Sequence, residues 1–69
     1  MTLSARNRLS GTVKSVRSEG LMGEVVVELD DGQEITSTIT SNSVDRLGIE
    51  EGDEIDAVIK ATEVMVEKN

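Results

Sequence analysis

The amino-acid sequence predicts an all-β domain: a small five-stranded barrel with one short helix after the third strand. Three observations support this prediction. Val, Ile and Thr are abundant and lie in short runs separated by turns that contain glycine, which is typical of β-strands. Several runs alternate apolar and polar residues, as strands with one buried face do. A single stretch of helical character, at residues 41–48, interrupts the pattern.

Five segments have the composition of strands, and they cover residues 8–17, 21–29, 33–40, 54–61 and 62–67. In the first of them Val16 breaks the alternation, so we expect a β-bulge near Ser15. The Asp-Asp-Gly sequence at residues 30–32 predicts a hairpin turn between the second and third strands, because Asp-Gly tolerates the positive φ that such turns require.

Residues 41–48 predict one short helix. Ser41 and Ser43 are capping residues, Val44 and Leu47 are apolar positions three apart, and Gly48 is a typical C-terminal cap. A helix directly after the third of five strands favours a barrel of the OB type over a β-sandwich.

The composition excludes several classes of function. The 69 residues include no Cys or His, which excludes thiolate and Ser-His-Asp catalysis and zinc fingers. A net charge of −7 argues against nucleic acid and anionic membranes as partners, and no aromatic residue offers a base-stacking platform. No apolar run reaches the ~20 residues of a membrane-spanning helix. We therefore expect one cytoplasmic domain over residues 1–69, without enzymatic activity and without a covalent cofactor.

Small size and unusual apolar triples predict self-association. A domain of this length buries a small share of its surface, and disulfides are excluded. The triples at residues 25–27, 57–59 and 64–66 place apolar side chains on both faces of a strand. Partner subunits that cover the outer faces would explain the triples. Ordinary apolar surface would explain them too, so that alternative stays open.

Basic residues are concentrated at the start of the chain. Residues 1–18 contain Arg6, Arg8, Lys14 and Arg17 and no acid, whereas all fourteen acidic residues lie further on. A locally positive segment in an acidic molecule could bind an anion. Charge balancing between neighbouring strands or subunits is the simpler interpretation, and charge alone favours it.

Small hydroxyl residues lie near one of these arginines and at the start of the predicted helix: Ser4, Thr40, Ser41 and Ser43. A tetrahedral oxyanion is held by several N–H and O–H donors together with one or two cations, so this set has suitable chemistry for an oxyanion site. The same side chains cap helices and form turns, which alone would explain Ser41 or Ser43. The residue types leave both roles open.

Three segments of the chain contain motifs that occur together, in this order, in one known family. Residues 4–13, Ser-Ala-Arg-Asn-Arg-Leu-Ser-Gly-Thr-Val, resemble an opening S-x-R-N-x-L-x-G-x-V motif. Residues 39–49 are similar to an I-T-x-x-S-x-x-x-L-x-L stretch, with Ile49 in place of the second Leu, and residues 52–64 match a closing G-x-x-V-x-A-x-I-K-A-T-x-V pattern, with Ile55 at the first Val position. With these three motifs the chain resembles the molybdate-binding Mop/TOBE domain family, whose free-standing members are the molbindins.

The resemblance implies an OB-like barrel that assembles as a hexamer, a trimer of dimers, and binds molybdate or tungstate between subunits for intracellular molybdenum storage. Arg6 and Lys60 would supply positive charge, and Ala61 a backbone N–H. Asn7 would contribute through its backbone or through structure. By position, the implied oxyanion contacts are Ser4, Arg6, Asn7, Thr40, Ser43, Lys60 and Ala61. Hydrogen bonds would hold the oxyanion, without direct ligation of the metal. The alternative is an oligomerisation module without physiological oxyanion binding.

Overall fold

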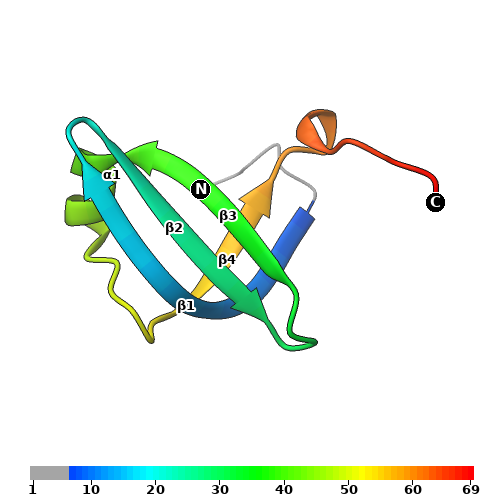
Figure 1. Cartoon of the computed structure of the whole chain (residues 1–69), viewed down its shortest axis with the longest axis horizontal. Helices are drawn as coiled ribbons and strands as arrows, with labels where there is room; N and C mark the ends of the chain where they lie inside the picture. The colour runs from blue at the N-terminus through cyan, green and yellow to red at the C-terminus, as the bar shows by residue number, and fades with distance from the viewer. Residues whose placement is uncertain (1–6) are drawn as a thin grey trace.

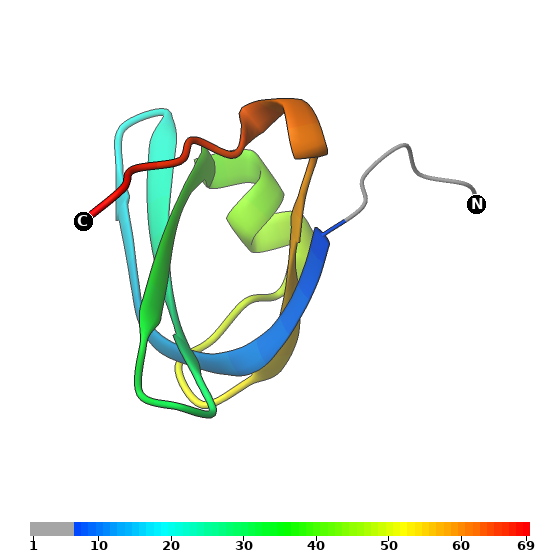
Figure 2. The ribbon, with the colours of Figure 1, turned by 90° about the vertical axis from the view of Figure 1, so that its right-hand side faces the viewer.

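The computed structural model describes residues 7–69. Its elements are, in chain order, β1 (Asn7–Glu19), β2 (Met22–Leu29), β3 (Glu34–Thr40), α1 (Ser41–Leu47), β4 (Glu54–Ile59) and the 3-10 helix η1 (Ala61–Glu63). The strands form one antiparallel sheet in the order β3-β2-β1-β4. The sheet curls into a half-barrel, and α1 lies against its concave side (Figures 1 and 2). None of the helices in the described part of the chain is long and apolar enough to cross a bilayer.

β1 is the strand about which the sheet curls. Its Gly11 pairs with Leu29 of β2 on one side and with Ile55 of β4 on the other. A Cβ atom at Gly11 would lie 2.5 Å from the carbonyl oxygen of Glu28, so only glycine fits where the three strands meet. The pairing with β2 shifts register between Val13 and Ser15, which confirms the expected bulge.

The turn and the helix predicted from the sequence are both present. Gly32 has a φ of 87°, and its N–H donates to the carbonyl oxygen of Leu29 at 2.9 Å. The N-cap of α1 is Thr40 rather than a serine, because the Thr40 side chain accepts the N–H of Ser43. Gly48 ends the helix in the left-handed conformation, with a φ of 65°.

The core is small and consists of valines: Val13, Val25, Val27 and Val44. Val44 is the only buried residue of α1, and it packs where β2 has Gly23. A Cβ atom at Gly23 would lie 2.8 Å from the Cγ2 atom of Val44, so the glycine makes room for the helix. Both glycines of the curled sheet thus set its shape through close contacts.

The prediction of a fifth strand at residues 62–67 is wrong for the single chain. β4 ends at Ile59 rather than at residue 61, η1 follows, and residues 64–69 have no regular secondary structure. A strand requires a hydrogen-bonded neighbour, and this segment extends away from the sheet (Figure 1). The described residues therefore form a four-stranded half-barrel rather than a five-stranded barrel.

Two of the three apolar triples lie on strands and do place side chains on both faces. Val25 and Val27 are buried, whereas Val26 between them is half-buried on the outer face. In β4, Val58 is 42% exposed on the outer face. The third triple, at residues 64–66, is exposed along its whole length.

Candidate functional site

The seven residues of the predicted oxyanion site fall into three sets. Ser4 and Arg6 lie outside the described residues. The second set is Asn7, Lys60 and Ala61, and the third is Thr40 and Ser43.

Asn7, Lys60 and Ala61 lie together where β1 begins and β4 ends. Asn7 pairs with Ile59, and its Nδ2 atom donates to the carbonyl oxygen of Ile59 at 3.4 Å. Lys60 and Ala61 follow directly, and η1 begins at Ala61. Asn7 therefore anchors the end of β4 and positions the two residues after it.

Lys60 and Ala61 have donors that the described fold does not use. Lys60 is exposed, and the ion pairs among residues 7–69 are formed by Lys14 and Arg8, not by Lys60. The N–H of Ala61 donates to no backbone acceptor within the same residues. Glu63 lies beside Lys60, because its N–H donates to the carbonyl oxygen of Lys60 at 2.9 Å. The sequence motifs did not single out Glu63. Glu63 follows Lys60 by three residues, and residues at this spacing come close together in a turn. This spacing is the feature of the sequence that indicates the contact.

Thr40 and Ser43 contact each other at the start of α1. The Oγ1 atom of Thr40 accepts the Ser43 N–H at 3.1 Å, and its hydroxyl donates to the Oγ atom of Ser43 at 2.8 Å. The Ser43 hydroxyl hydrogen has no acceptor among the described residues. Thr40 thus has the capping role that sequence analysis kept as an alternative, while Ser43 retains a donor.

The start of α1 offers fewer free amides than a helix terminus normally would. The N–H of Ser41 donates to the carbonyl oxygen of Leu21 at 2.8 Å, and that of Ser43 donates to Thr40. The helix has only seven residues. Any oxyanion contact here would therefore depend mainly on the hydroxyl groups.

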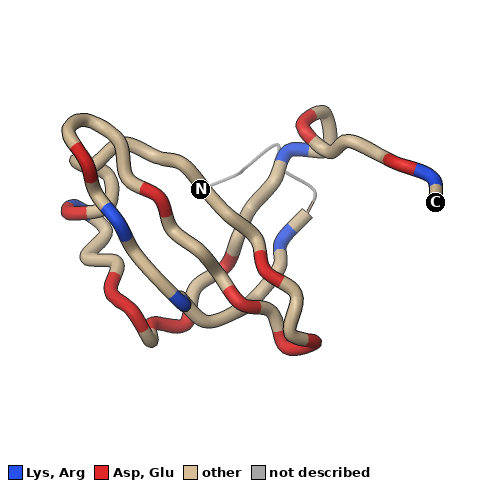
Figure 3. Tube along the Cα trace, viewed as in Figure 1, with Lys and Arg blue, Asp and Glu red and all other residues tan. Residues whose placement is uncertain are grey.

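The two described sets do not converge within one chain. In Figure 1, α1 lies at the left end of the molecule, whereas η1 and the end of β4 lie at the right. Lys60 is the N-cap of η1, and Figure 3 shows a blue segment just before η1 on that right-hand side. A site built from both sets would therefore need a second copy of the chain.

Two of the N-terminal cations are paired with carboxylates. Arg8 contacts Asp56 at 3.1 Å, and Lys14 forms an ion pair with Glu34. The hydrogen bond from Ser10, and then that from Arg8, lower the pKa of Asp56. For Arg8 and Lys14, charge balancing between strands is confirmed as the correct interpretation.

Most acidic residues lie away from Lys60, and Glu63 of η1 is the acidic residue beside it. Eight of the fourteen lie around the β2–β3 turn or in and beside the loop before β4, which are both on the lower side of the molecule in Figure 3: Glu28, Asp30, Asp31, Glu34, Glu50, Glu51, Asp53 and Glu54. The molecule measures 35 × 28 × 23 Å, and exposed charges are screened over a Debye length of ~8 Å in physiological salt. The net charge of −7 thus overstates the repulsion that an anion would meet near Lys60.

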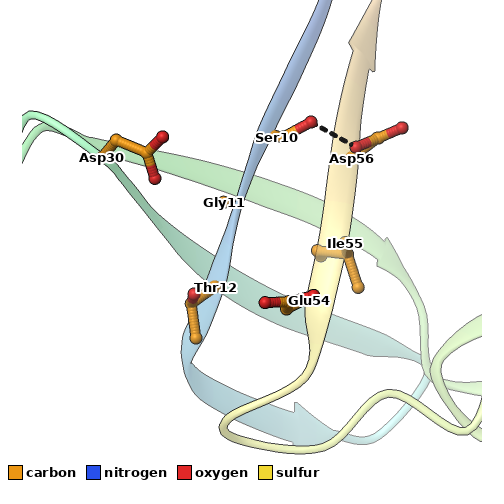
Figure 4. A pocket seen from close by; sticks show the side chains of 7 residues that line it. All are labelled: Ser10, Gly11, Thr12, Asp30, Glu54, Ile55 and Asp56. Carbon is orange, nitrogen blue, oxygen red and sulfur yellow. Dashed lines mark hydrogen bonds between the residues drawn. The ribbon is translucent and has the colours of Figure 1, made fainter.

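A polar cavity of about 390 Å³ lies elsewhere, between β1, β4 and the β2–β3 turn (Figure 4). Asp30, Glu54 and Asp56 contribute carboxylates to its lining. These charges make the cavity unsuitable for a dianion. Among residues 7–69, no group of three or more carboxylates is arranged to hold a metal ion.

Comparison with known proteins identifies the family. The family model of the TOBE domain matches residues 3–66. The chain belongs to the TOBE domain family. This confirms the resemblance found in the three sequence motifs, and the half-barrel with its short helix is a TOBE domain with an OB-like fold.

Known relatives of this TOBE domain match it over nearly its whole length. Molybdenum-pterin-binding protein 1 of Clostridium pasteurianum is 47% identical over 66 residues, which cover 96% of this chain and 97% of that protein. A molybdate-binding protein from Sporomusa ovata superimposes with a TM-score of 0.92 at 38% identity, covering 99% of this chain and 100% of that one. The cytoplasmic molybdate-binding protein ModG, with molybdate bound, gives a TM-score of 0.83 at 46% identity, covering 88% of this chain and 43% of ModG.

Proposed function

We propose that this TOBE domain binds molybdate or tungstate without catalysis, at interfaces between copies of itself, and stores molybdenum in the cytoplasm. The observation that supports this most strongly is the match to a molybdate-binding protein with a TM-score of 0.92, which covers 99% of this chain and 100% of that one. A relative at 47% identity is also named for molybdenum binding. These relatives favour oxyanion binding over an oligomerisation module without a ligand.

The donor set suits a fully deprotonated oxyanion. Near neutral pH molybdate is a dianion without a proton to donate, so a site made only of donors satisfies all of its oxygens. Phosphate at the same pH keeps a hydroxyl that would face these donors unpaired. Sulfate has the charge and shape of molybdate in a smaller volume, so we expect the size of the site to disfavour it.

We assign the oxyanion contacts to Ser4, Arg6, Asn7, Thr40, Ser43, Lys60 and Ala61. Lys60, the Ala61 N–H and the Ser43 hydroxyl are available in the described fold, and Asn7 holds the end of β4 in place. Ser43 lies in α1 and Lys60 directly before η1, and the separation of these two elements within one chain (Figure 1) supports a site shared by two subunits. A hexamer built as a trimer of dimers would supply such shared sites.

The ligand proposed here is the free oxyanion rather than a molybdenum-pterin complex. Flat heteroaromatic rings are commonly held by stacking against aromatic side chains. The sequence contains no Phe, Tyr or Trp. The small donors at Lys60, Ala61 and Ser43 fit four metal-bound oxygens and offer no platform for a pterin ring.

Equilibrium dialysis with radiolabelled molybdate tests this function, with tungstate, sulfate and phosphate as competitors. We expect tungstate to compete well and phosphate poorly. Lys60→Ala and Arg6→Ala should each weaken molybdate binding about 10-fold or more, as loss of a charge-assisted hydrogen bond does. Lys14→Ala is the matched control, because it removes the same charge from a lysine that is paired with Glu34. Equal affinities of Lys60→Ala, Arg6→Ala and Lys14→Ala would contradict the assigned site, and a wild-type protein that binds no molybdate would refute the function.

A further inference from the structure

Three charged side chains share the outer face of the sheet where β1 begins and β4 ends. Exposed and half-buried residues alternate along β4, so Asp56 and Val58 point to the same face. Lys60 is exposed and has extended backbone angles (φ −66°, ψ 139°), so it continues this row. Arg8 of β1 is the pairing partner of Val58. Arg8 is therefore a diagonal neighbour of Asp56 in one direction and of Lys60 in the other.

In the structure Arg8 bonds to Asp56. Its Nη1 atom donates to Oδ2 of Asp56 at 3.1 Å. The hydroxyl of Ser10 donates to Oδ1 of the same carboxylate at 2.8 Å (Figure 4). The bond from Ser10, and then that from Arg8, lower the pKa of Asp56, so the carboxylate is charged at neutral pH. Ser10 thus orients the carboxylate that holds Arg8.

This ion pair is suited to exchange. The side chain of Arg8 is 60% exposed and that of Asp56 38%, and exposed pairs are weak because water competes for both charges. Diagonal neighbours on paired strands are ~7–8 Å apart, which is within reach of long side chains. A guanidinium that reaches Asp56 is therefore long enough to reach an anion beside Lys60. In Figure 3 the blue segments at the start of β1 and just before η1 both lie on the right-hand side.

The charge beside Lys60 decides which neighbour attracts Arg8. Without an anion, the ammonium of Lys60 repels the guanidinium and the carboxylate of Asp56 attracts it. A dianion bound to Lys60 reverses the sign at that position, because its two negative charges exceed the one positive charge of the ammonium. A dianion in contact with the guanidinium also carries twice the charge of a carboxylate.

We propose that Arg8 changes partner when the oxyanion binds: it leaves Asp56 and contacts the oxyanion beside Lys60. This inference rests on the proposed function and adds Arg8 to its binding site as a further cation. Asp56 is then a positioning residue that competes with the oxyanion for Arg8. The competition lowers the affinity of the site, because each oxyanion must first break an existing ion pair. A lowered affinity suits a store that has to release its molybdenum.

A double-mutant cycle in molybdate affinity tests the exchange. Equilibrium dialysis compares the wild type, Asp56→Asn, Arg8→Ala and the doubly substituted chain. Asp56→Asn frees Arg8, so we expect it to raise the affinity about two- to five-fold, which corresponds to the strength of an exposed ion pair. Arg8→Ala should weaken binding. In a chain that already carries Arg8→Ala, the substitution Asp56→Asn should give no gain.

A control separates the exchange from a general effect of charge. Glu54→Gln removes the same charge from the same face of β4, and Glu54 forms no ion pair among residues 7–69. Its molybdate affinity should stay within about 1.5-fold of wild type, since its charge lies further from Lys60 and holds no arginine. An equal gain from Asp56→Asn with and without Arg8 would overturn the exchange, and so would the absence of any gain.

NMR of the wild type gives a second readout that needs no substitution. A titration with molybdate follows the carboxyl ¹³C resonance of Asp56 and the Nε–H resonance of Arg8. We expect both resonances to shift by saturation, whereas the carboxyl resonance of Asp31, in the β2–β3 turn, should not. An Asp56 resonance that moves no more than that of Asp31 would overturn the exchange.

The same experiments distinguish this inference from the proposed function. A wild type that binds molybdate and loses affinity with Lys60→Ala, but shows neither the coupling between Arg8 and Asp56 nor the shift of the Asp56 resonance, would refute the exchange alone. A wild type that binds no molybdate in dialysis would refute the proposed function, and the exchange with it.

Discussion

The curled sheet with α1 and the segment after β4 use their apolar residues in opposite ways. Val13, Val25 and Val27 are 1–2% exposed in the sheet, where β1, β2 and α1 enclose them. Met65 and Val66, equally apolar, are more than 90% exposed. The apolar side chains of the first region are buried by contacts within the chain, whereas those of the second region remain exposed. The difference shows that a strand-forming composition is not enough: a strand also needs an edge to pair with.

The largest expected effect comes from replacing one valine by alanine in each region. Val27→Ala removes two methyl groups from a side chain that is 1% exposed, and it should lower the free energy of unfolding by about 2–3 kcal/mol. Val66→Ala should change it by less than about 0.5 kcal/mol in the dissociated chain, because Val66 is 92% exposed there. Urea denaturation at low protein concentration measures both values.

The effect of Val66→Ala on stability should depend on protein concentration. At concentrations where the wild type assembles, Val66→Ala should unfold at a lower urea concentration than wild type, since the side chain would be buried against a second copy. A Val66→Ala chain that matches wild type at every concentration would show that the C-terminal segment has no partner.

Much of the curled region could be predicted from the sequence because its signals are local. Alternation located the strands to within two residues at most boundaries, the disturbed alternation at Val16 located the bulge, and Gly32 located the hairpin turn. The N-cap was misassigned because Thr40 and its serine neighbours have the same capping chemistry, and only backbone angles distinguish them.

The C-terminal region could not be predicted in the same way, because its structure depends on contacts that are not local. Residues 62–67 have the composition of a strand, but pairing is decided by which edge is within reach. The site has the same limitation. Motif positions grouped Lys60 with Ser43, whereas η1, which follows Lys60, and α1, which contains Ser43, lie on opposite sides of one folded chain (Figure 1).

An intermediate effect separates the two described sets of site residues. Thr40→Ala removes the N-cap of α1 and should cost about 1 kcal/mol of stability as well as weakening molybdate binding. Lys60→Ala should weaken binding with little change in stability, because Lys60 is exposed and pairs with no carboxylate among the described residues. Thermal unfolding and dialysis on the same samples measure the two quantities. The reverse ranking of the two variants in stability would show that α1 is not capped by Thr40.

The smallest expected effect concerns Asp56, which lies on β4 between the two regions. Hydrogen bonds from Ser10 and Arg8 hold the pKa of Asp56 below its ordinary value of 3.8. A depressed folded-state pKa stabilises the fold above the unfolded pKa, and this contribution disappears as the pH falls through the folded pKa. Ser10→Ala removes the larger cause, so its stability should approach that of wild type as the pH falls below 3.8. Ser18→Ala, an exposed serine on the same strand, should show the wild-type pH profile. Because the Ser10–Asp56 bond joins β1 to β4, a constant difference between Ser10→Ala and wild type at all pH values would mean that Ser10 acts through packing instead.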